Sequence, residues 1–528
     1  MNQNEVYDAI IVGSGPAGMA SAYQLRGLNV LVLDVGNRPK EIPDFSENLY
    51  DLKEKRNLFK ELIGESFESL HNIDKHYLSP KLKAPGMSFI TEGQDQLSPV
   101  STKEFEGVQS FSFGGLANAW GAGMLRFNEY DLQGFPISYA DLKPYYDQLS
   151  DIMGISGEND DLSKFFGEDE KFLKPHTLGR LGEDLLSKYN KNKSLFHKNG
   201  FYFGKNRLAV LTEKKGNREP LHYDNLEFFK SNIPAIYNPT YTLNELIEGK
   251  LIQYRKGYLV ESYTQAEGEV KVKAIHLESG NAEIFRTKYL VLAAGCLNSA
   301  KIVLRANNAY TESLPLYDNA ISYVPFLIPK FIGKPIERSA YSAQLVFVHE
   351  DPKTKERING SFYGLSGPLK SDLLFEFPLS LKANLYASKY LVPALAVFQL
   401  FYFDRDHSEN CISLGQDFSI KISYKKQMNQ SFKIEKKLIS ILRRFGYFSH
   451  SALCKFPAAG NSFHYAGCLP MKASPKEFQV DAQGKLWNSE RVFIADSSNF
   501  SAFPAKNHSY TIMANAMRIS DLLRKRIS

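Results

Sequence analysis

The sequence contains few cysteines, and their spacing limits the sites they can form. There are four among 528 residues: Cys296, Cys411, Cys454 and Cys468. No two make a C-x-x-C pair, so the spacing gives little support to a metal centre or a redox-active dithiol. Reduced thiols in a cytoplasmic protein are the simpler interpretation.

The sequence also lacks a long hydrophobic segment. Its most apolar run, Leu391 to Phe403, is interrupted by Pro393 and Gln399 and is too short to span a bilayer. No secretory signal precedes the first predicted strand, and we find no internal repeat or low-complexity stretch. We therefore expect a cytoplasmic protein, with membrane association left open but not predicted.

The bulk composition is that of a large globular protein. Hydrophobic residues make up 43% and charged residues 23% of the chain. A length of 528 residues predicts two or three domains. The net charge of +6 is too small an excess to indicate a nucleic-acid partner.

The N-terminal residues predict a β-α-β unit. Ala9 to Val12 and Asn29 to Leu33 are short apolar runs, typical of buried parallel strands. Between them lie a glycine-rich turn, Gly13 to Gly18, and a helical segment, Ala17 to Arg26. Asp34 ends the second strand. This order of elements is that of a nucleotide-binding fold.

The glycines of the turn have separate physical roles. In G-x-G-x-x-G, Gly13 makes the tight turn, Gly15 lets the backbone approach a pyrophosphate, and Gly18 lets the helix pack on the strand. Asp34 can accept hydrogen bonds from ribose hydroxyls. The unit alone does not distinguish NAD from FAD.

Further strands and helices follow after an irregular, Lys-rich stretch from residue 39 to 99. Strands are predicted at Tyr258 to Glu261, Val270 to Leu277 and Tyr289 to Ala293, with a helix at Asn298 to Arg305. A last buried strand is predicted at 492–495, with a C-terminal helix from about Tyr510. Residues 316–454, including the alternating segments 339–348 and 419–424, predict a mostly antiparallel sheet in a separate domain.

Four further segments carry a family resemblance. They are Gly114-Gly115-Leu-Ala-Asn118-Ala-Trp120-Gly121 with Arg126, the stretch 135–157, Ala293-Ala-Gly295 with Asn298-Ser299, and a C-terminal set containing His464, Asp496 and Asn507 to Thr511. Their order and spacing resemble the glucose–methanol–choline (GMC) oxidoreductases, most closely the sugar-oxidising, pyranose 2-oxidase-like branch. The stretch 316–400 shows little resemblance.

The resemblance implies an α/β fold with a discontinuous Rossmann-type FAD-binding domain and a substrate domain with a mostly antiparallel sheet and helices. The first is expected to comprise residues 1–45, 95–130, 205–310 and 456–528. The second, with insertions, comprises 46–94, 131–204 and 311–455.

The resemblance also implies an FAD site and a catalytic pair. The residues expected to bind FAD are Gly13, Gly15, Pro16, Ala17, Gly18, Asp34, Gly36, Gly114, Gly115, Asn118, Trp120, Gly121, Val260, Ala294, Gly295, Asn298, Asp496, His508 and Ser509; no metal is expected. His464 is expected to act as a base titrating near neutrality, and Asn507 as a donor to the substrate oxygen. His508 stands where the family often has Pro, and its backbone is expected against the flavin.

One departure concerns how the flavin is held. In pyranose 2-oxidase the residue before the Trp of the glycine-rich segment is a histidine bonded to the flavin. Here that residue is Ala119, so non-covalent FAD is predicted.

The leading hypothesis is an FAD-dependent enzyme that oxidises a primary or secondary alcohol of a sugar, glycoside or cyclitol. The electron acceptor, oxygen or another molecule, is not specified by the sequence. One alternative is a sterol or lipid-alcohol oxidase, in which the apolar stretch Tyr386 to Phe403 would be a membrane-facing or lipid-lining element; a strand is the simpler interpretation of this stretch. The other alternative is a non-catalytic flavin-binding subunit. The C-terminal flavin segments disfavour an NAD dehydrogenase.

Overall fold

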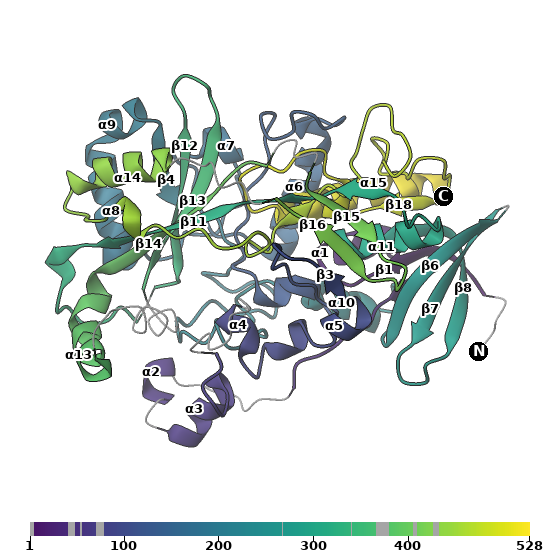
Figure 1. Ribbon diagram of the computed structural model, residues 1–528, viewed down its shortest axis with the longest axis horizontal. Helices are drawn as coiled ribbons and strands as arrows, with labels where there is room; N and C mark the ends of the chain where they lie inside the picture. Colours follow the sequence, from purple (N-terminus) through teal and green to yellow (C-terminus); the bar gives the residue numbers. More distant parts are fainter. Residues whose placement is uncertain are drawn as a thin grey trace.

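The computed structural model describes residues 5–40, 48–52, 55–69, 79–266, 268–338, 340–365, 380–404, 409–425 and 432–528. The mixed α/β class predicted from the sequence is confirmed: several sheets and helices form two lobes, with β6 to β8 at one end and β12, β13 and α14 at the other (Figure 1).

A seven-stranded sheet contains the predicted nucleotide-binding unit. Its order is β5-β2-β1-β8-β7-β6, with β18 also paired to β8. The pairs among β5, β2, β1, β8 and β18 are parallel, whereas β7 and β6 add an antiparallel edge. The strands are β1 (Val6–Val12), β2 (Val30–Leu33), β5 (Gln253–Arg255), β6 (Tyr258–Ala266), β7 (Glu269–His276), β8 (Ala282–Leu292) and β18 (Val492–Ile494).

Helices cover both faces of this sheet, which explains the apolar runs Ala9 to Val12 in β1 and Val30 to Leu33 in β2. Ala9 and Ile11 of β1 face a core shared with α1 (Pro16–Leu25), α6 (Tyr139–Met153), α10 (Pro239–Glu248) and α15 (Ser509–Ile527). Ile10 and Val12 face a second core with α11 (Cys296–Ala306). Burial on both faces is expected for a parallel sheet.

A five-stranded antiparallel sheet forms the second lobe, in the order β11-β14-β13-β12-β4. One face of β14 buries Ala396, Phe398 and Leu400 against α8 and α14 in a separate core. The elements are β4 (Phe201–Lys205), β11 (Ile321–Leu327), β12 (Ala343–Glu350), β13 (Arg357–Gly364), β14 (Leu395–Phe401), α8 (Arg180–Lys191), α9 (Lys193–Lys198) and α14 (Lys433–Arg443).

Smaller elements join the lobes. A four-stranded sheet contains β3 (Val100–Ser101), β16 (Ile420–Ser423), β15 (Cys411–Leu414) and β9 (Ser313–Pro315), while β10 (Tyr317–Asp318) pairs with β17 (Tyr465–Ala466). The remaining α-helices of the described residues are α2 (Leu49–Leu52), α3 (Arg56–Ile63), α4 (Pro80–Lys83), α5 (Gln94–Leu97), α7 (Ser163–Phe166) and α13 (Leu381–Leu391). Short 3-10 turns include η2 (Gly115–Ala119), η4 (Val392–Ala394) and η6 (Ser497–Asn499).

The apolar stretch from Tyr386 to Phe403 changes structure at Pro393. Its first part belongs to α13, Pro393 lies in η4, and the strand interpretation is confirmed for β14. Within the described residues, no helix combines the length and apolar character that a bilayer crossing needs.

Candidate active site

A cavity of about 680 Å³ opens between the two lobes. One side is lined by the loop after β1, including Gly13 and Gly15, and by residues 293–298 between β8 and α11. The other side is lined by Tyr363 of β13 and by Gln399 and Phe401 of β14. His464 and Asn507 both line it as well.

The glycine turn leaves room for a ligand at one position only. Gly13 has φ +96°, and a Cβ there would lie 2.6 Å from the Ala293 carbonyl oxygen. A Cβ on Gly18 would lie 1.9 Å from the Gly13 carbonyl oxygen. A Cβ on Gly15, by contrast, would meet nothing nearer than the Gly115 Cα at 4.0 Å. This open space at the N-terminus of α1, where free N–H groups and the helix dipole favour anions, fits a pyrophosphate.

Asp34 lies at the end of β2, beside this turn. Its Oδ2 accepts hydrogen bonds from the Ser14 hydroxyl and, at 3.3 Å, from the Tyr254 hydroxyl. Burial raises the pKa of Asp34 to about 7, against the lowering effect of these hydrogen bonds. A ligand that offered further hydroxyl donors would stabilise the carboxylate, which is the role expected for a ribose.

Asp496 holds together two segments of the cavity wall. Its Oδ2 accepts from the Gly295 N–H at 2.9 Å and the Ser299 hydroxyl at 2.5 Å, and its Oδ1 accepts from the Ser498 N–H at 3.0 Å. It thus caps η6 and fixes the turn before α11. Asp496 also lines the cavity, as a residue expected to bind the cofactor would.

The glycine-rich segment around η2 forms the next part of the wall. Asn118 Nδ2 donates to the carbonyl oxygens of Phe113 and Gly115, at 2.9 Å each, so its side chain stabilises the turn. Trp120 Nε1 donates to the Tyr237 carbonyl at 2.9 Å. Ala119 lines the cavity, and its carbonyl oxygen accepts from Lys81 Nζ at 2.9 Å.

Most residues predicted to bind the cofactor therefore lie at one cavity. Those that line it are Gly13, Gly15, Pro16, Ala17, Asp34, Gly115, Trp120, Gly121, Val260, Ala294, Gly295, Asn298, Asp496, His508 and Ser509. Gly18, Gly36, Gly114 and Asn118 do not line it; a Cβ on any of these three glycines would lie under 3.0 Å from a neighbouring atom, and the Asn118 amide stabilises its turn.

His464 lies in the loop before β17, in a polar and aromatic setting. The preceding residue, Phe463, has a left-handed φ of +56°, and the His464 N–H donates to the Ser462 hydroxyl at 3.0 Å. The imidazole stacks on Phe401 with ring centroids 5.1 Å apart. Its Nδ1 is buried and has no hydrogen-bond partner among the described residues. A ring fixed in this way can exchange a proton with a ligand in the cavity.

His508 lines the cavity beside His464. It meets the His464 ring edge to face, with centroids 4.5 Å apart. Burial lowers the pKa of His464 to about 4, and burial and then the His464 charge lower the pKa of His508 well below its usual value. Both rings are neutral at pH 7, so the titration near neutrality expected for His464 does not hold for this form of the protein.

A buried ion pair anchors the loop that carries Asn507. The preceding residue, Lys506, pairs with Asp131, and its Nζ also donates to the carbonyl oxygens of Phe165 at 2.8 Å and Arg126 at 3.2 Å. Asn507 itself is placed against Gly123, where a Cβ would lie 3.3 Å from the Asn507 Nδ2. Gly123 therefore leaves the space that the amide needs.

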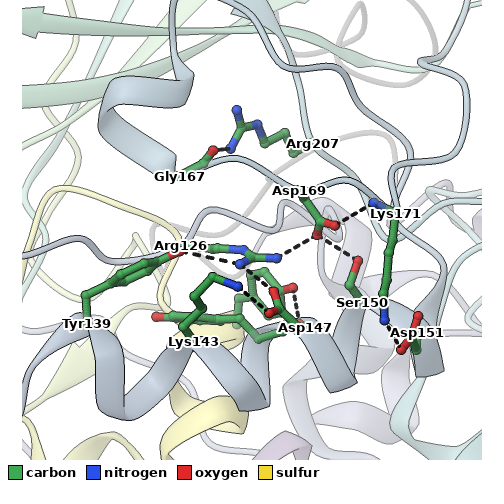
Figure 2. Close-up of polar contacts among 12 residues, drawn as sticks. Arg126, Tyr139, Lys143, Asp147, Ser150, Asp151, Gly167, Asp169, Lys171 and Arg207 are labelled. Atoms are coloured by element: carbon green, nitrogen blue, oxygen red, sulfur yellow. Dashed lines mark hydrogen bonds and ion pairs between the residues drawn. The ribbon is translucent and has the colours of Figure 1, made fainter.

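Arg126 is itself fixed by a second set of charges, shown in Figure 2. Its guanidinium bridges Asp147 of α6, at 2.8 Å, and Asp169, at 2.7 Å, and Ser150 donates to the same Asp169 oxygen at 2.8 Å. The Arg126 and Asp169 side chains are both 3% exposed. This cluster holds the backbone of Arg126, and hence the carbonyl that receives Lys506.

The cavity wall opposite the glycine turn is polar. Tyr363 and Gln399 line the cavity, and Tyr323, which is opposite Gln399 on the neighbouring strand, lies on the same face of the sheet behind them. The Tyr363 hydroxyl donates to Gln399 Oε1 at 3.1 Å, and Gln399 Nε2 donates to the Tyr323 hydroxyl at 3.3 Å. Burial raises the pKa of both tyrosines, so their hydroxyls stay protonated.

Sequence reasoning missed several of these groups. Ser14 and Tyr254 on Asp34, the ion pair of Lys506, and the polar face of β13 and β14 were not predicted. One of these features, the polar face of β14, had a signal in the sequence. In the segment Leu395 to Phe401, Gln399 stands alone among apolar residues on the strand.

Comparisons with known proteins converge on one enzyme class. Residues 446–516 match the family model described as GMC oxidoreductase. The 2-methyl-1,2-propanediol dehydrogenase of Mycolicibacterium austroafricanum is 22% identical over 438 residues, covering 76% of this chain and 77% of that protein.

Solved structures share the fold along the whole chain. A pyridoxine 4-oxidase from Mesorbium loti superposes with a TM-score of 0.60 at 12% identity, covering 98% of this chain and 99% of the other. A formate oxidase variant from Aspergillus oryzae RIB40, studied for FAD modification, gives 0.60 at 11% identity, covering 100% and 99%. At such identities the likeness concerns the fold.

Proposed function

We propose that this chain is a GMC oxidoreductase that binds FAD and oxidises a CH–OH group of a sugar, glycoside or cyclitol; the match of residues 446–516 to the GMC family model and the likeness to a dehydrogenase support the family. The observation that carries the proposal is the single cavity in which the glycine turn, His464, Asn507 and a polar wall come together. Bound FAD would supply the hydride acceptor.

The residues present fit a dinucleotide. The open space above Gly15 suits a pyrophosphate, and Asp34 suits a ribose. Ala119 offers no side chain for a covalent link, which supports non-covalent FAD. The four cysteines are free thiols, which supports a cytoplasmic location.

In the proposed mechanism, this chain's residues move the hydroxyl proton and hold the oxygen. His464 is neutral and can accept the proton as the C–H bond breaks. Its contact with Phe401 fixes the plane of the ring. The Asn507 amide donates to the substrate oxygen without competing for the proton. The ion pair of Lys506 with Asp131 keeps that amide in position.

The substrate class is supported by the polar wall. Gln399 and Tyr363 line the cavity, and their amide and phenol groups can form further hydrogen bonds with a polyhydroxylated ligand. A sterol would offer few hydrogen-bonding groups to this wall, so it would make less use of it than a polyhydroxylated ligand would. Because the 2-methyl-1,2-propanediol dehydrogenase is among the relatives of this chain, small diols are also candidate substrates.

The test is anaerobic mixing of the purified protein with a panel of sugars, glycosides, cyclitols, small diols and sterols. Loss of the flavin's visible absorption with one of the first three classes supports the proposal. Reduction by sterols alone would favour the lipid-alcohol alternative, and a flavin that none of the panel reduces would favour a non-catalytic subunit.

A further inference from the structure

Two cysteines that are distant in the sequence meet beside the cavity. The Sγ atoms of Cys296 and Cys468, 172 residues apart, lie 3.3 Å from each other. Cys468 is fully buried and Cys296 is 5% exposed. Cys411 and Cys454 are half-buried and lie in β15 and after the turn 451–453. The spacing argument against a dithiol therefore fails for one pair, because the fold brings it together.

This pair lies where three segments of the cavity wall meet. Cys296 is the first residue of α11 and lines the cavity directly after Gly295, whose N–H donates to Asp496. Cys468 follows β17, between Gly467 and Leu469, whose N–H groups donate to the carbonyl oxygens of Ser497 at 3.0 Å and Ser498 at 2.7 Å. A bond between the two sulfurs would tie α11, the loop after β17 and η6 into one unit.

We propose that Cys296 and Cys468 are a redox-active dithiol that a hydroperoxide oxidises to an intramolecular disulfide, closing the wall of the dinucleotide cavity. A disulfide is about 2.05 Å long, so the sulfurs must approach by about 1.3 Å, a small shift for two side chains already in contact.

The reaction balances with hydrogen peroxide as the oxidant. The sulfur of Cys296, the member of the pair that lines the cavity, attacks one peroxide oxygen; the O–O bond breaks, the Cys296 proton leaves with the other oxygen as water, and a sulfenic acid remains. The Cys468 sulfur then attacks the Cys296 sulfur, the S–O bond breaks, and the Cys468 proton leaves with the hydroxide as a second water. The two thiols together lose two electrons, and the peroxide gains them.

The surroundings assign the two sulfurs different roles. Burial raises the pKa of Cys468 well above its usual value, so it is a poor first nucleophile toward peroxide. It lies in contact with Cys296, which is the position a resolving thiol needs.

Thiol counting on the full-length protein tests the dithiol. The folded protein is treated with hydrogen peroxide, quenched, denatured and alkylated, and its peptides are read by mass spectrometry without reduction. Alkylated thiols should fall from four to two per chain, with a crosslinked peptide joining Cys296 to Cys468 that dithiothreitol separates. Cys296→Ser and Cys468→Ser should abolish the crosslink, and the matched controls Cys411→Ser and Cys454→Ser should retain it.

Four alkylated thiols after peroxide, or a crosslink through Cys411 or Cys454, would overturn the proposal. The closing of the cavity rests on the proposed function and is measured separately, as the rate at which FAD leaves on dilution. Oxidised protein should release FAD several-fold more slowly than reduced protein, and Cys296→Ser should show no such difference. Equal rates would overturn the cavity-closing role. A crosslinked chain that never binds FAD would contradict the proposed function and not the dithiol.

Discussion

At the scale of single residues, burial decides the protonation state of the proposed base. His464 lies against Phe401 and His508, and burial lowers its pKa to about 4. A lone imidazole in the sequence predicts titration near neutrality, because nothing in the motif specifies how dry its surroundings are. The His464 Nδ1 has no hydrogen-bond partner within the described part of the chain, so it can accept a hydrogen bond from a ligand.

The pH profile of flavin reduction follows from this pKa. A base works only when neutral, so activity is lost as the pH falls through the pKa of His464, about 4, and is constant above about pH 6. Rates of anaerobic reduction by saturating substrate, measured by stopped flow between about pH 4 and 9, check this. A rate that rises through a pKa near 7, with a rise that disappears in His464→Ala, would contradict it.

At the scale of elements, the loop before α15 is positioned by a buried charge pair. Lys506→Met leaves Asp131 buried without its cation and should destabilise the protein by about 3–5 kcal/mol, measured by denaturant unfolding. The matched control, Lys525→Met, removes an exposed lysine from its pair with Asp521 in α15 and should cost at most about 1 kcal/mol. Equal costs for the two variants would show that Lys506 anchors nothing.

The polar face of β13 and β14 makes a second prediction at this scale. Gln399→Leu keeps the size of the side chain but removes the partner of Tyr363 and Tyr323. It should raise KM for a polyhydroxylated substrate about tenfold, as expected for one or two lost hydrogen bonds, while FAD stays bound. Tyr7→Phe, which removes a hydroxyl that pairs with Glu5 at the start of β1, is the control. An unchanged KM in Gln399→Leu would remove this face from substrate binding.

The elements that sequence predicts well are those with a local cause. The apolar runs of β1 and β2, with the glycines between them, are found where they were predicted. Residues 386–391 are helical, whereas the sequence interpretation was a strand. A short apolar run has no periodicity that distinguishes a helix from a strand. The ion pair of Lys506 with Asp131 and the contact between Cys296 and Cys468 could not be predicted from the sequence. In each case the two partners are far apart along the chain.

At the scale of the whole molecule, the proposed FAD site is assembled from segments near both ends of the chain and from its middle. Gly15, Gly295 and Asp496 come from the start, the middle and the end of the sequence and line one cavity. The domain boundaries given above remain a prediction. These boundaries assign α6 to the substrate domain and α15 to the FAD-binding domain. The two helices pack together, and the Tyr510 hydroxyl of α15 donates to the Tyr146 carbonyl of α6 at 2.7 Å.

Gly15→Val tests this assembly without removing any wall of the cavity. Its side chain would enter the open space beside Gly115, where the pyrophosphate is proposed to lie. The variant should keep its circular dichroism spectrum and lose FAD. Stoichiometric FAD in folded Gly15→Val would place the dinucleotide elsewhere.

The central claim is that His464 accepts the hydroxyl proton during alcohol oxidation in this cavity, and single-turnover flavin reduction tests it most directly. With the substrate found in the panel, His464→Ala should bind FAD as wild type does but reduce it about a hundred- to ten-thousand-fold more slowly. Asn507→Ala should lose a similar amount or less, since the two act on one hydroxyl group. Reduction of His464→Ala at the wild-type rate would contradict the account, and a loss confined to His508→Ala would move the base to that residue.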